Sequence, residues 1–218
     1  VISGLADAGY TDVCLVIGPE HDMIRDYYDS VPKSRVNISY AIQEEPLGTA
    51  DAVLAAEEFA GEDAVLVLNS DNYYPVDGYR ALREVPASGL VGFDRDALIA
   101  ESNIPADRIT SFALALADEG GNLTEIIEKP DAETLAKVGE DAAISMNLWM
   151  LSPAIFDAAR RIEKSPRGEY ELQDAVRLAM AEGEVFTVAP LEAGVLDMSN
   201  RDDIASVASA LDGVEVTL

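Results

Sequence analysis

Hydrophobic positions along the chain fall into short clusters, separated by stretches with helical periodicity. Apolar runs bounded by Gly, Pro, Asn or Asp predict strands, and apolar residues spaced three or four apart predict helices between them. The predicted strands are Val13–Ile17, Val36–Ile42, Ala64–Leu68, Leu90–Phe93, Ile109–Leu116, Leu123–Ile127, Ile144–Leu151, Val185–Val188 and Val195–Met198. The predicted helices are Val1–Ala8, Asp22–Tyr28, Ala50–Phe59, Pro153–Ile162, Leu172–Ala181 and Asp203–Ala210.

The alternation of these elements predicts the fold class. Apolar strands that alternate with helices are typical of an α/β protein, with a mostly parallel central sheet covered by helices on both faces. The turn at Asp118–Asn122 predicts a hairpin, and therefore an antiparallel extension of that sheet. No linker, low-complexity segment or internal repeat divides the chain, so residues 1–218 are expected to form one domain.

Charge narrows the class of partner. The 218 residues carry 41 Asp and Glu against 15 Lys and Arg, which gives a formal net charge of −26. Such a field repels nucleic acid and anionic lipid, so neither is expected as a partner. The acidic residues are scattered, which predicts a solvated acidic surface, with adaptation to a salt-rich environment as the alternative. No apolar run approaches the ~20 residues of a membrane span.

Cysteine and histidine each occur only once, which excludes several chemistries. Cys14 cannot form an internal disulfide, which favours a reducing, cytoplasmic compartment. His21 lies at the start of a short predicted helix beside Asp22, so no Ser-His-Asp triad can be built around it. No Cys and His cluster supports a zinc site.

Four polar groups directly follow predicted strands, where ligands bind in open α/β sheets. The first is residues 43–49, Gln-Glu-Glu-Pro-Leu-Gly-Thr. It combines an amide side chain, a glycine that lets a backbone approach a flat ligand, and a helix start whose N–H groups suit an anion. The alternative is an ordinary strand–turn–helix corner in which Thr49 is the helix N-cap.

Two of the other groups are aspartates. Asp71 follows the strand Ala64–Leu68, and Asp197 follows the apolar pair Val195–Leu196. A carboxylate at the end of a buried strand needs a cation or several donors, and Asp71 lacks an adjacent base, which favours a hard cation such as Mg²⁺. The two aspartates can share one ion if their strands are neighbours. For Asp71 the alternative is a turn that caps the next helix.

The remaining group is Glu128-Lys129-Pro130, at the end of Leu123–Ile127. Lysine occurs at only four positions in the chain. A lysine at a strand end can neutralise a bound phosphate. The alternative is a surface ion pair with Glu128, worth under about 1 kcal/mol.

Taken in order, these groups resemble the sugar-1-phosphate nucleotidylyltransferases, such as the glucose-1-phosphate thymidylyl- and uridylyltransferases. The matching residues are Gln43, Pro46, Gly48, Thr49 and Ala50, then Asp71-Asn72, Glu128-Lys129-Pro130, Gly168, Glu169, Glu171, Leu172 and Asp174, and finally Leu196-Asp197. The resemblance covers most of the chain and implies a Rossmann-like nucleotide-diphospho-sugar transferase domain. It also implies that a Gly-rich loop of the family precedes Val1.

The resemblance implies a role for each matching residue. Gln43 and Gly48 would face the nucleotide base, with Pro46, Thr49 and Asn72 also on the nucleotide side. Asp71 and Asp197 would hold Mg²⁺. The sugar phosphate would meet Lys129, with Glu128 at the sugar hydroxyls, Glu169 along the sugar side, and Asn147 where members of the family usually carry glycine. The catalytic residues would be Lys129 and Asp71.

The implied reaction transfers a nucleotidyl group from an NTP to a sugar-1-phosphate, and yields an NDP-sugar and pyrophosphate. One alternative is a regulatory subunit of the same fold that binds nucleotide or sugar phosphate without catalysis. Another is a metal-dependent glycosyltransferase, although Asp71-Asn72-Tyr73 lacks the two acids flanking one residue that such an enzyme would need. The sequence leaves the base, the sugar and the oligomeric state open, a homo-oligomer included.

Overall fold

The computed structural model describes residues 1–138 and 142–218. The chain divides into two compact units, here called the sheet unit and the helix-rich unit. The sheet unit contains Val1, Leu66–Met150 and Val185–Glu215, and the helix-rich unit contains Ile2–Val65, Leu151–Glu184 and Val216–Leu218. The assignment of residues 1–218 to a single domain stays a prediction.

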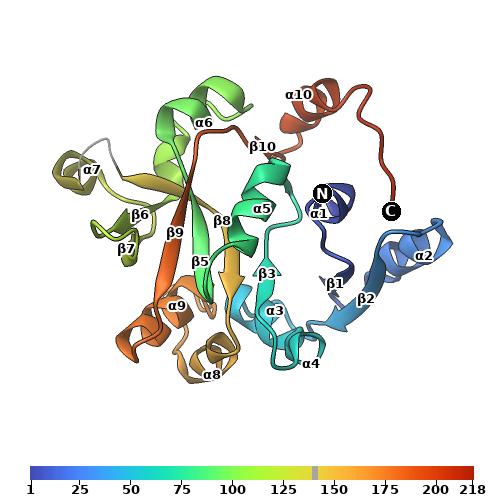
Figure 1. Cartoon of the computed structure of the whole chain (residues 1–218), viewed down its shortest axis with the longest axis horizontal. Helices are drawn as coiled ribbons and strands as arrows, with labels where there is room; N and C mark the ends of the chain where they lie inside the picture. The colour runs from blue at the N-terminus through green and yellow to red at the C-terminus, as the bar shows by residue number, and fades with distance from the viewer. Residues whose placement is uncertain (139–141) are drawn as a thin grey trace. The chain divides into compact units, whose positions relative to one another are not determined.

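The helix-rich unit contains a parallel strand pair and most of the N-terminal elements (Figure 1). Strands β1 and β2 pair in parallel, with Val13 opposite Ile38 and Ile17 opposite Ile42. Its elements are α1 (Ile2–Asp7), β1 (Asp12–Ile17), α2 (Asp22–Ser30), β2 (Asn37–Ile42), α3 (Thr49–Ala55), α4 (Glu57–Ala60), α8 (Ala154–Arg161) and α9 (Leu172–Ala181). Helices α3, α8 and α9 pack on one another, and the buried Ala50, Phe156 and Val176 belong to them.

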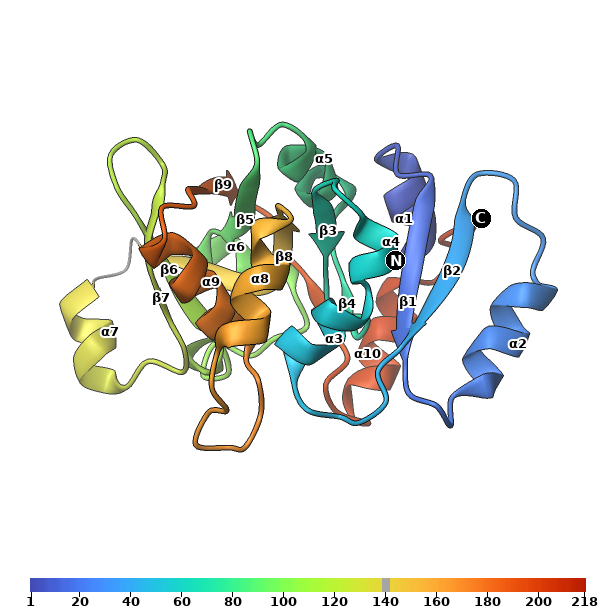
Figure 2. The same ribbon diagram turned by 90° about the horizontal axis from the view of Figure 1, so that it is seen from below.

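The sheet unit is built on strands in the order β7-β6-β8-β5-β9, with β3 also paired to β8 (Figures 1 and 2). Its strands are β3 (Val65–Val67, of which Val65 falls in the other unit), β4 (Asn72–Tyr73), β5 (Ser88–Phe93), β6 (Ala113–Ala117), β7 (Leu123–Ile127), β8 (Ala143–Leu151), β9 (Phe186–Leu191) and β10 (Leu196–Asp197). Its helices are α5 (Val76–Arg83), α6 (Arg95–Glu101), the 3-10 turn Ile109–Ser111, α7 (Ala132–Val138) and α10 (Asp203–Ala210).

The strand pairings make the sheet mixed. Strands β5 and β9 are parallel, whereas β5–β8, β8–β6 and β6–β7 are antiparallel. The predicted α/β class is confirmed, together with the antiparallel extension that the β6–β7 hairpin supplies. The core of this sheet includes Trp149 and Phe186, which are fully buried and meet edge to face at 6.3 Å between ring centroids.

Every predicted strand and helix has a counterpart in the structure; most ends lie within three residues of the prediction, and two predictions differ more. The helix predicted over Ala50–Phe59 is two helices, α3 and α4, because Ala56 leaves helical geometry with φ −93° and ψ 7°. The strand predicted to begin at Ile109 begins at Ala113, after the 3-10 turn. None of the described helices combines the length and the apolar character needed to cross a bilayer.

Candidate functional site

The candidate residues divide between the two units. Gln43, Pro46, Gly48, Thr49 and Glu169 lie in the helix-rich unit, whereas Asp71, Asn72, Glu128, Lys129, Asn147 and Asp197 lie in the sheet unit. Each set is described within its own unit below.

Gln43 follows β2 and continues its ladder, since its backbone N–H donates to the Ile17 carbonyl at 2.9 Å. Its side-chain Nε2 donates to the Gly48 carbonyl at 3.1 Å and to Asp51 Oδ2 at 2.8 Å. A backbone carbonyl and a carboxylate can only accept, so the amide must present its NH₂ group to both of them. The amide oxygen of Gln43 is therefore on the side away from Gly48 and Asp51, and it can accept a hydrogen bond from a ligand N–H.

The backbone of Tyr170 leaves room only for glycine at position 48. The φ of Gly48 is 120°, a left-handed value that favours glycine, and a Cβ built there would lie 2.5 Å from the Tyr170 carbonyl oxygen. The backbone approach that the sequence predicts at this glycine is made here by Tyr170. A role in facing the nucleotide base stays a prediction for Gly48, as does a nucleotide-side role for Pro46 in the preceding turn.

Thr49 is the first residue of α3, and Gly48 holds the N-cap position. The expectation that Thr49 caps this helix is therefore wrong. Its Oγ1 instead accepts a hydrogen bond at 2.9 Å from the backbone N–H of Leu172, the first residue of α9. A hydroxyl at the start of one helix thus satisfies a donor at the start of another.

Glu169 is exposed and directly precedes Tyr170. The neighbouring Arg167, which the sequence analysis did not single out, forms an ion pair with Glu171 at 2.7 Å. Ser165 Oγ donates to the same Glu171 oxygen at 2.9 Å. The cation Arg167 and the polar side chains of Ser165 and Glu171 therefore form a cluster next to Glu169 in the sequence, in the segment predicted to line the sugar side.

In the sheet unit, β4 and β10 pair in antiparallel fashion with Asp197 opposite Asn72. The Met198 N–H donates to the Asp71 carbonyl at 3.0 Å, next to that pair. Asp71 is exposed, and Asp197 is buried. The strand that pairs with β10 is therefore β4, which follows Asp71, and not β3, which precedes it and pairs with β8. The backbones of Asp71 and Asp197 come close together through this pairing, and a shared ion stays a prediction.

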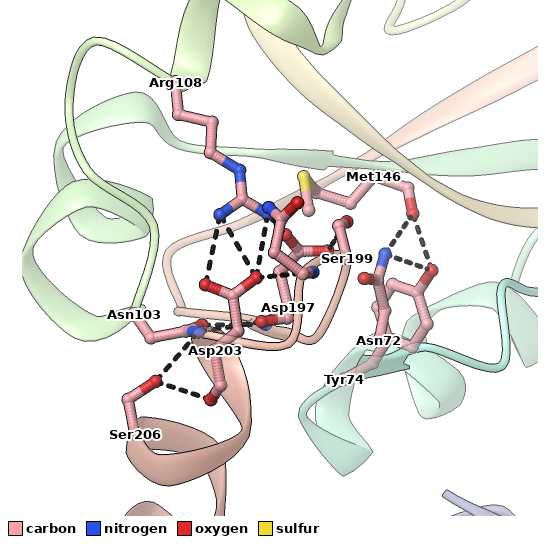
Figure 3. A network of polar contacts seen from close by, with 10 residues as sticks. Asn72, Tyr74, Asn103, Arg108, Met146, Asp197, Ser199, Asp203 and Ser206 are labelled. Atoms are coloured by element: carbon pink, nitrogen blue, oxygen red, sulfur yellow. Dashed lines mark hydrogen bonds and ion pairs between the residues drawn. The ribbon is translucent and has the colours of Figure 1, made fainter.

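The Asp197 carboxylate lies in a network of polar contacts (Figure 3). Its side chain is 2% exposed, and it forms an ion pair with Arg108, which also pairs with Asp203 at 3.3 Å. Ser199 Oγ donates to the other carboxylate oxygen at 2.8 Å. The Arg108 guanidinium also donates a hydrogen bond to the Asp203 carboxylate, and this bond is the main reason that the pKa of Asp203 is below its ordinary value.

Asn103 fixes the backbone of Asp197. Its Oδ1 accepts from the Asp197 N–H and its Nδ2 donates to the Asp197 carbonyl, both at 2.8 Å (Figure 3). One amide side chain therefore bonds both backbone groups of the residue, as a neighbouring strand would. Neither Asn103 nor Arg108 was predicted, because the sequence separation from Asp197 hides the contacts.

Asn72, the first residue of β4, is buried. Its Nδ2 donates to Tyr74 OH at 3.1 Å, and that hydroxyl donates to the Met146 carbonyl at 2.6 Å (Figure 3). Burial raises the pKa of the Tyr74 phenol, which keeps the donor protonated. The Asn72 Oδ1 is buried with no hydrogen-bond partner within residues 1–138 and 142–218. An orphaned buried acceptor of this kind is rare.

Two residues of the predicted sugar-phosphate side have left-handed backbones. Lys129 has a φ of 43° and Asn147 a φ of 56°. Asparagine is among the few residues that adopt this conformation readily, so Asn147 can take the place that glycine holds in the resembling family. Lys129 is exposed and has no ion pair among the described residues, which disfavours the surface-pair alternative.

Asp71 and Asp197 fit a magnesium ion that takes only two ligands from the protein. Over the described ranges, no three His, Cys, Asp or Glu side chains are grouped to hold a metal by themselves. Mg²⁺, however, commonly takes one or two carboxylates and completes its shell with water and substrate phosphates. Each Asp197 oxygen accepts one hydrogen bond and keeps a second lone pair. The donor set therefore suits an ion shared with phosphate oxygens.

A sequence profile of the family described as "Nucleotidyl transferase" matches residues 1–211. The chain belongs to this family. The chain is 31% identical over 206 residues to the low-salt glycan biosynthesis nucleotidyltransferase Agl11 of Haloferax volcanii, covering 93% of this chain and 54% of Agl11. It is 28% identical over 202 residues to the UTP–glucose-1-phosphate uridylyltransferase AglF of the same organism, covering 91% and 76%. The chain thus spans about half the length of Agl11.

Two solved structures have the same fold as this chain. A UDP-glucose pyrophosphorylase in complex with UDP-glucose superposes with a TM-score of 0.73 at 15% identity, over 98% of this chain and 87% of that one. An apo UDP-glucose pyrophosphorylase superposes with a TM-score of 0.77 at 15% identity, over 97% and 86%. At this identity the likeness concerns the fold alone.

Proposed function

We propose that the chain transfers a nucleotidyl group from an NTP to a sugar-1-phosphate, with Mg²⁺ as cofactor. The β4–β10 pairing carries the proposal, because it brings the backbones of two predicted metal ligands, Asp71 and Asp197, close together from distant parts of the sequence. Membership of the nucleotidyl transferase family supports the reaction class. The names of AglF and of a Streptomyces griseus relative, a glucose-1-phosphate thymidylyltransferase 29% identical over 206 residues, make UTP, dTTP and glucose-1-phosphate the first substrates to test.

In the proposed reaction an oxygen of the sugar phosphate attacks the α-phosphorus of the NTP. The bond from that phosphorus to the bridging oxygen of the β-phosphate breaks, and pyrophosphate leaves. Positioning and charge neutralisation dominate such transfers. Bound Mg²⁺ would neutralise charge on the triphosphate.

The chain's own residues would orient both substrates. Asp71 and Asp197 would hold the ion, and Arg108, Ser199 and Asn103 keep Asp197 in one orientation. The exposed Lys129 would meet the sugar phosphate. The other assignments are Gln43, Pro46, Gly48, Thr49 and Asn72 for the nucleotide, and Glu128, Asn147 and Glu169 for the sugar.

The compartment is part of the same proposal. Cys14 is a free thiol, and burial raises its pKa above the ordinary value. A protonated, unpaired cysteine fits the reducing cytoplasm in which we infer that the enzyme acts.

Pyrophosphate release by the complete gene product that contains this sequence tests the function. The assay supplies Mg²⁺, glucose-1-phosphate and each of UTP, dTTP, CTP, GTP and ATP in turn. We expect release with at least one NTP and its loss in EDTA. Binding of an NTP without turnover, across several sugar phosphates, would instead favour the non-catalytic regulatory subunit.

The substitution Asp71→Ala tests the metal assignment. We expect turnover to fall on the order of 100-fold or more, because the ion stabilises transition-state charge by several kcal/mol. Stability should change little, since Asp71 is exposed. Asp212→Ala is the matched control, because it removes an equal charge from an exposed position in the same unit. Unchanged turnover in Asp71→Ala would remove Asp71 from the metal site.

A further inference from the structure

Two segments of the helix-rich unit are joined directly, although they lie far apart in the sequence. Three hydrogen bonds connect them: Tyr170 N–H to the Leu47 carbonyl at 2.7 Å, Ala50 N–H to the Tyr170 carbonyl at 2.9 Å, and Leu172 N–H to Thr49 Oγ1 at 2.9 Å. We call residues 47–50 and 170–172 together the 47–172 junction.

The junction is close-packed as well as hydrogen-bonded. Besides the Tyr170 oxygen, a Cβ at Gly48 would meet the Tyr170 nitrogen at 2.7 Å, so the two backbones are in contact there. The N-cap of α9, Glu171, makes no side-chain cap bond of its own. Thr49 supplies that acceptor instead, and α3 packs on α9 behind it. The start of α9 and the start of α3 are therefore fixed by the same atoms.

Candidate ligand groups flank the junction on both sides. Gln43, assigned to the nucleotide base, bonds the Gly48 carbonyl at 3.1 Å. Glu169, assigned to the sugar side, is the residue before Tyr170. A ligand that restrains Gln43 also restrains the Gly48 carbonyl to which Gln43 bonds, and the three junction bonds extend that restraint to Tyr170 and to the adjacent Glu169. The second ligand then has less conformational entropy to lose.

We propose that the 47–172 junction couples the binding of the two substrates, with Thr49 as its positioning residue. The inference rests on the proposed function, since it uses the assignment of Gln43 to the nucleotide and of Glu169 to the sugar phosphate. Each substrate tightens the binding of the other by the same factor, as linkage requires. Couplings of this kind commonly amount to about fivefold or more.

The coupling is measured directly with ligands that bind but cannot react. The probes are α,β-methylene-UTP, whose α–β bridge cannot be cleaved, and glucose-1-phosphate, both with Mg²⁺. If dTTP is the substrate in the turnover assay, α,β-methylene-dTTP replaces the uridine analogue. Calorimetric titration gives the dissociation constant of the nucleotide analogue with and without saturating glucose-1-phosphate, and we expect a decrease of about fivefold or more.

Two substitutions at one position separate coupling from direct contact. Thr49→Val keeps the side-chain shape but removes the acceptor, and should bring the ratio of the two dissociation constants close to one. Thr49→Ser keeps the hydroxyl and should restore the ratio. If Thr49 acted only by touching the nucleotide, Thr49→Val would weaken both dissociation constants and leave their ratio unchanged. Hydrogen exchange at the Leu172 amide should accelerate in Thr49→Val and recover in Thr49→Ser.

The outcomes distinguish this inference from the function on which it rests. If both probes bind the unmodified protein and the ratio is one, the coupling is refuted and the proposed function stands. If the ratio survives in Thr49→Val, the assignment to the junction is refuted. If neither probe binds and no NTP supports turnover, the proposed function itself fails, and the coupling fails with it.

Discussion

Gly48 has the narrowest requirements of the candidate residues. Its φ of 120° and its contact with the Tyr170 backbone both exclude a side chain. Asn147 shows the opposite case, because a left-handed φ of 56° there is met by a residue that is not glycine. The difference has a steric cause: asparagine adopts a φ near 56° readily, whereas a φ of 120° with a ψ of 178° is essentially restricted to glycine, and a backbone 2.5 Å from the position of Cβ leaves no room for a side chain.

The substitution Gly48→Ala should therefore be strongly destabilising. Gly61→Ala is the matched control in the same unit, because Gly61 also has a positive φ of 58° but a Cβ there would meet nothing within 4 Å. We expect Gly61→Ala to cost roughly 1–3 kcal/mol, because a φ of 58° with a ψ of −122° is strained for alanine, and Gly48→Ala roughly 2 kcal/mol more because the junction must open. Denaturant unfolding measures both, and equal costs would show that the Tyr170 contact is not tight.

At the scale of elements, the two-residue strand β10 is held from both sides. On one edge the Met198 N–H donates to the carbonyl of Asp71, the residue before β4, and on the other the Asn103 side chain bonds both backbone groups of Asp197. So short a strand has few ladder bonds of its own. Its position, and with it the position of the Asp197 carboxylate, depends on side chains from the segment after α6.

The substitution Asn103→Ala tests this dependence. It leaves a buried N–H and a buried carbonyl of Asp197 without partners, and we expect a loss of about 2 kcal/mol in the free energy of unfolding. Asn37→Ala is the control, since Asn37 makes an exposed side-chain bond to Asp12 and its loss should change stability little. If the two substitutions cost the same, the Asn103 contacts do not stabilise β10.

At the scale of the whole molecule, charge dominates. A formal charge of −26 on 218 residues means that acidic side chains outnumber basic ones by 26. Self-repulsion of this size destabilises the compact state. The described ion pairs do not offset it, because most of them are exposed, as Arg80–Asp77 and Arg161–Asp157 are, and pairs of this kind contribute little.

Salt should therefore stabilise the protein. Raising NaCl from 0.1 M to 1 M shortens the screening length from about 10 Å to about 3 Å. We expect the unfolding temperature to rise by several degrees, given that about 1 kcal/mol corresponds to roughly 2–4 °C at this chain length. KCl at equal ionic strength should act alike. An unfolding temperature that falls or stays flat would mean that screening of favourable pairs outweighs the relief of repulsion.

The sequence predicts most of the fold, for physical reasons. Buried strands leave apolar runs bounded by turn residues, so β1, β5 and β8 are evident from local pattern. Helices α5, α6 and α7 were not predicted: they are eight, seven and seven residues long, and so short a helix spans only about two turns. The break between α3 and α4 was missed as well, since alanine-rich text favours one continuous helix.

The candidate site divides in the same way. Strand-end polar residues such as Asp71 and Gln43 can be predicted, because strand ends are recognisable in the sequence. The contact partners of the site residues cannot be predicted in this way. Arg108 contacts Asp197, and Leu172 contacts Thr49, only after the chain has folded. No local pattern records such contacts.

The central claim is that the sugar phosphate attacks the α-phosphorus of the NTP, and isotopic labelling tests it most directly. The complete gene product is given Mg²⁺, glucose-1-phosphate and the NTP that supports turnover, labelled at either the α- or the γ-phosphate. We predict that the α-label appears in an NDP-sugar and the γ-label in pyrophosphate. A γ-label in a sugar bisphosphate or in inorganic phosphate would instead mean phosphoryl transfer or hydrolysis, and would contradict the account.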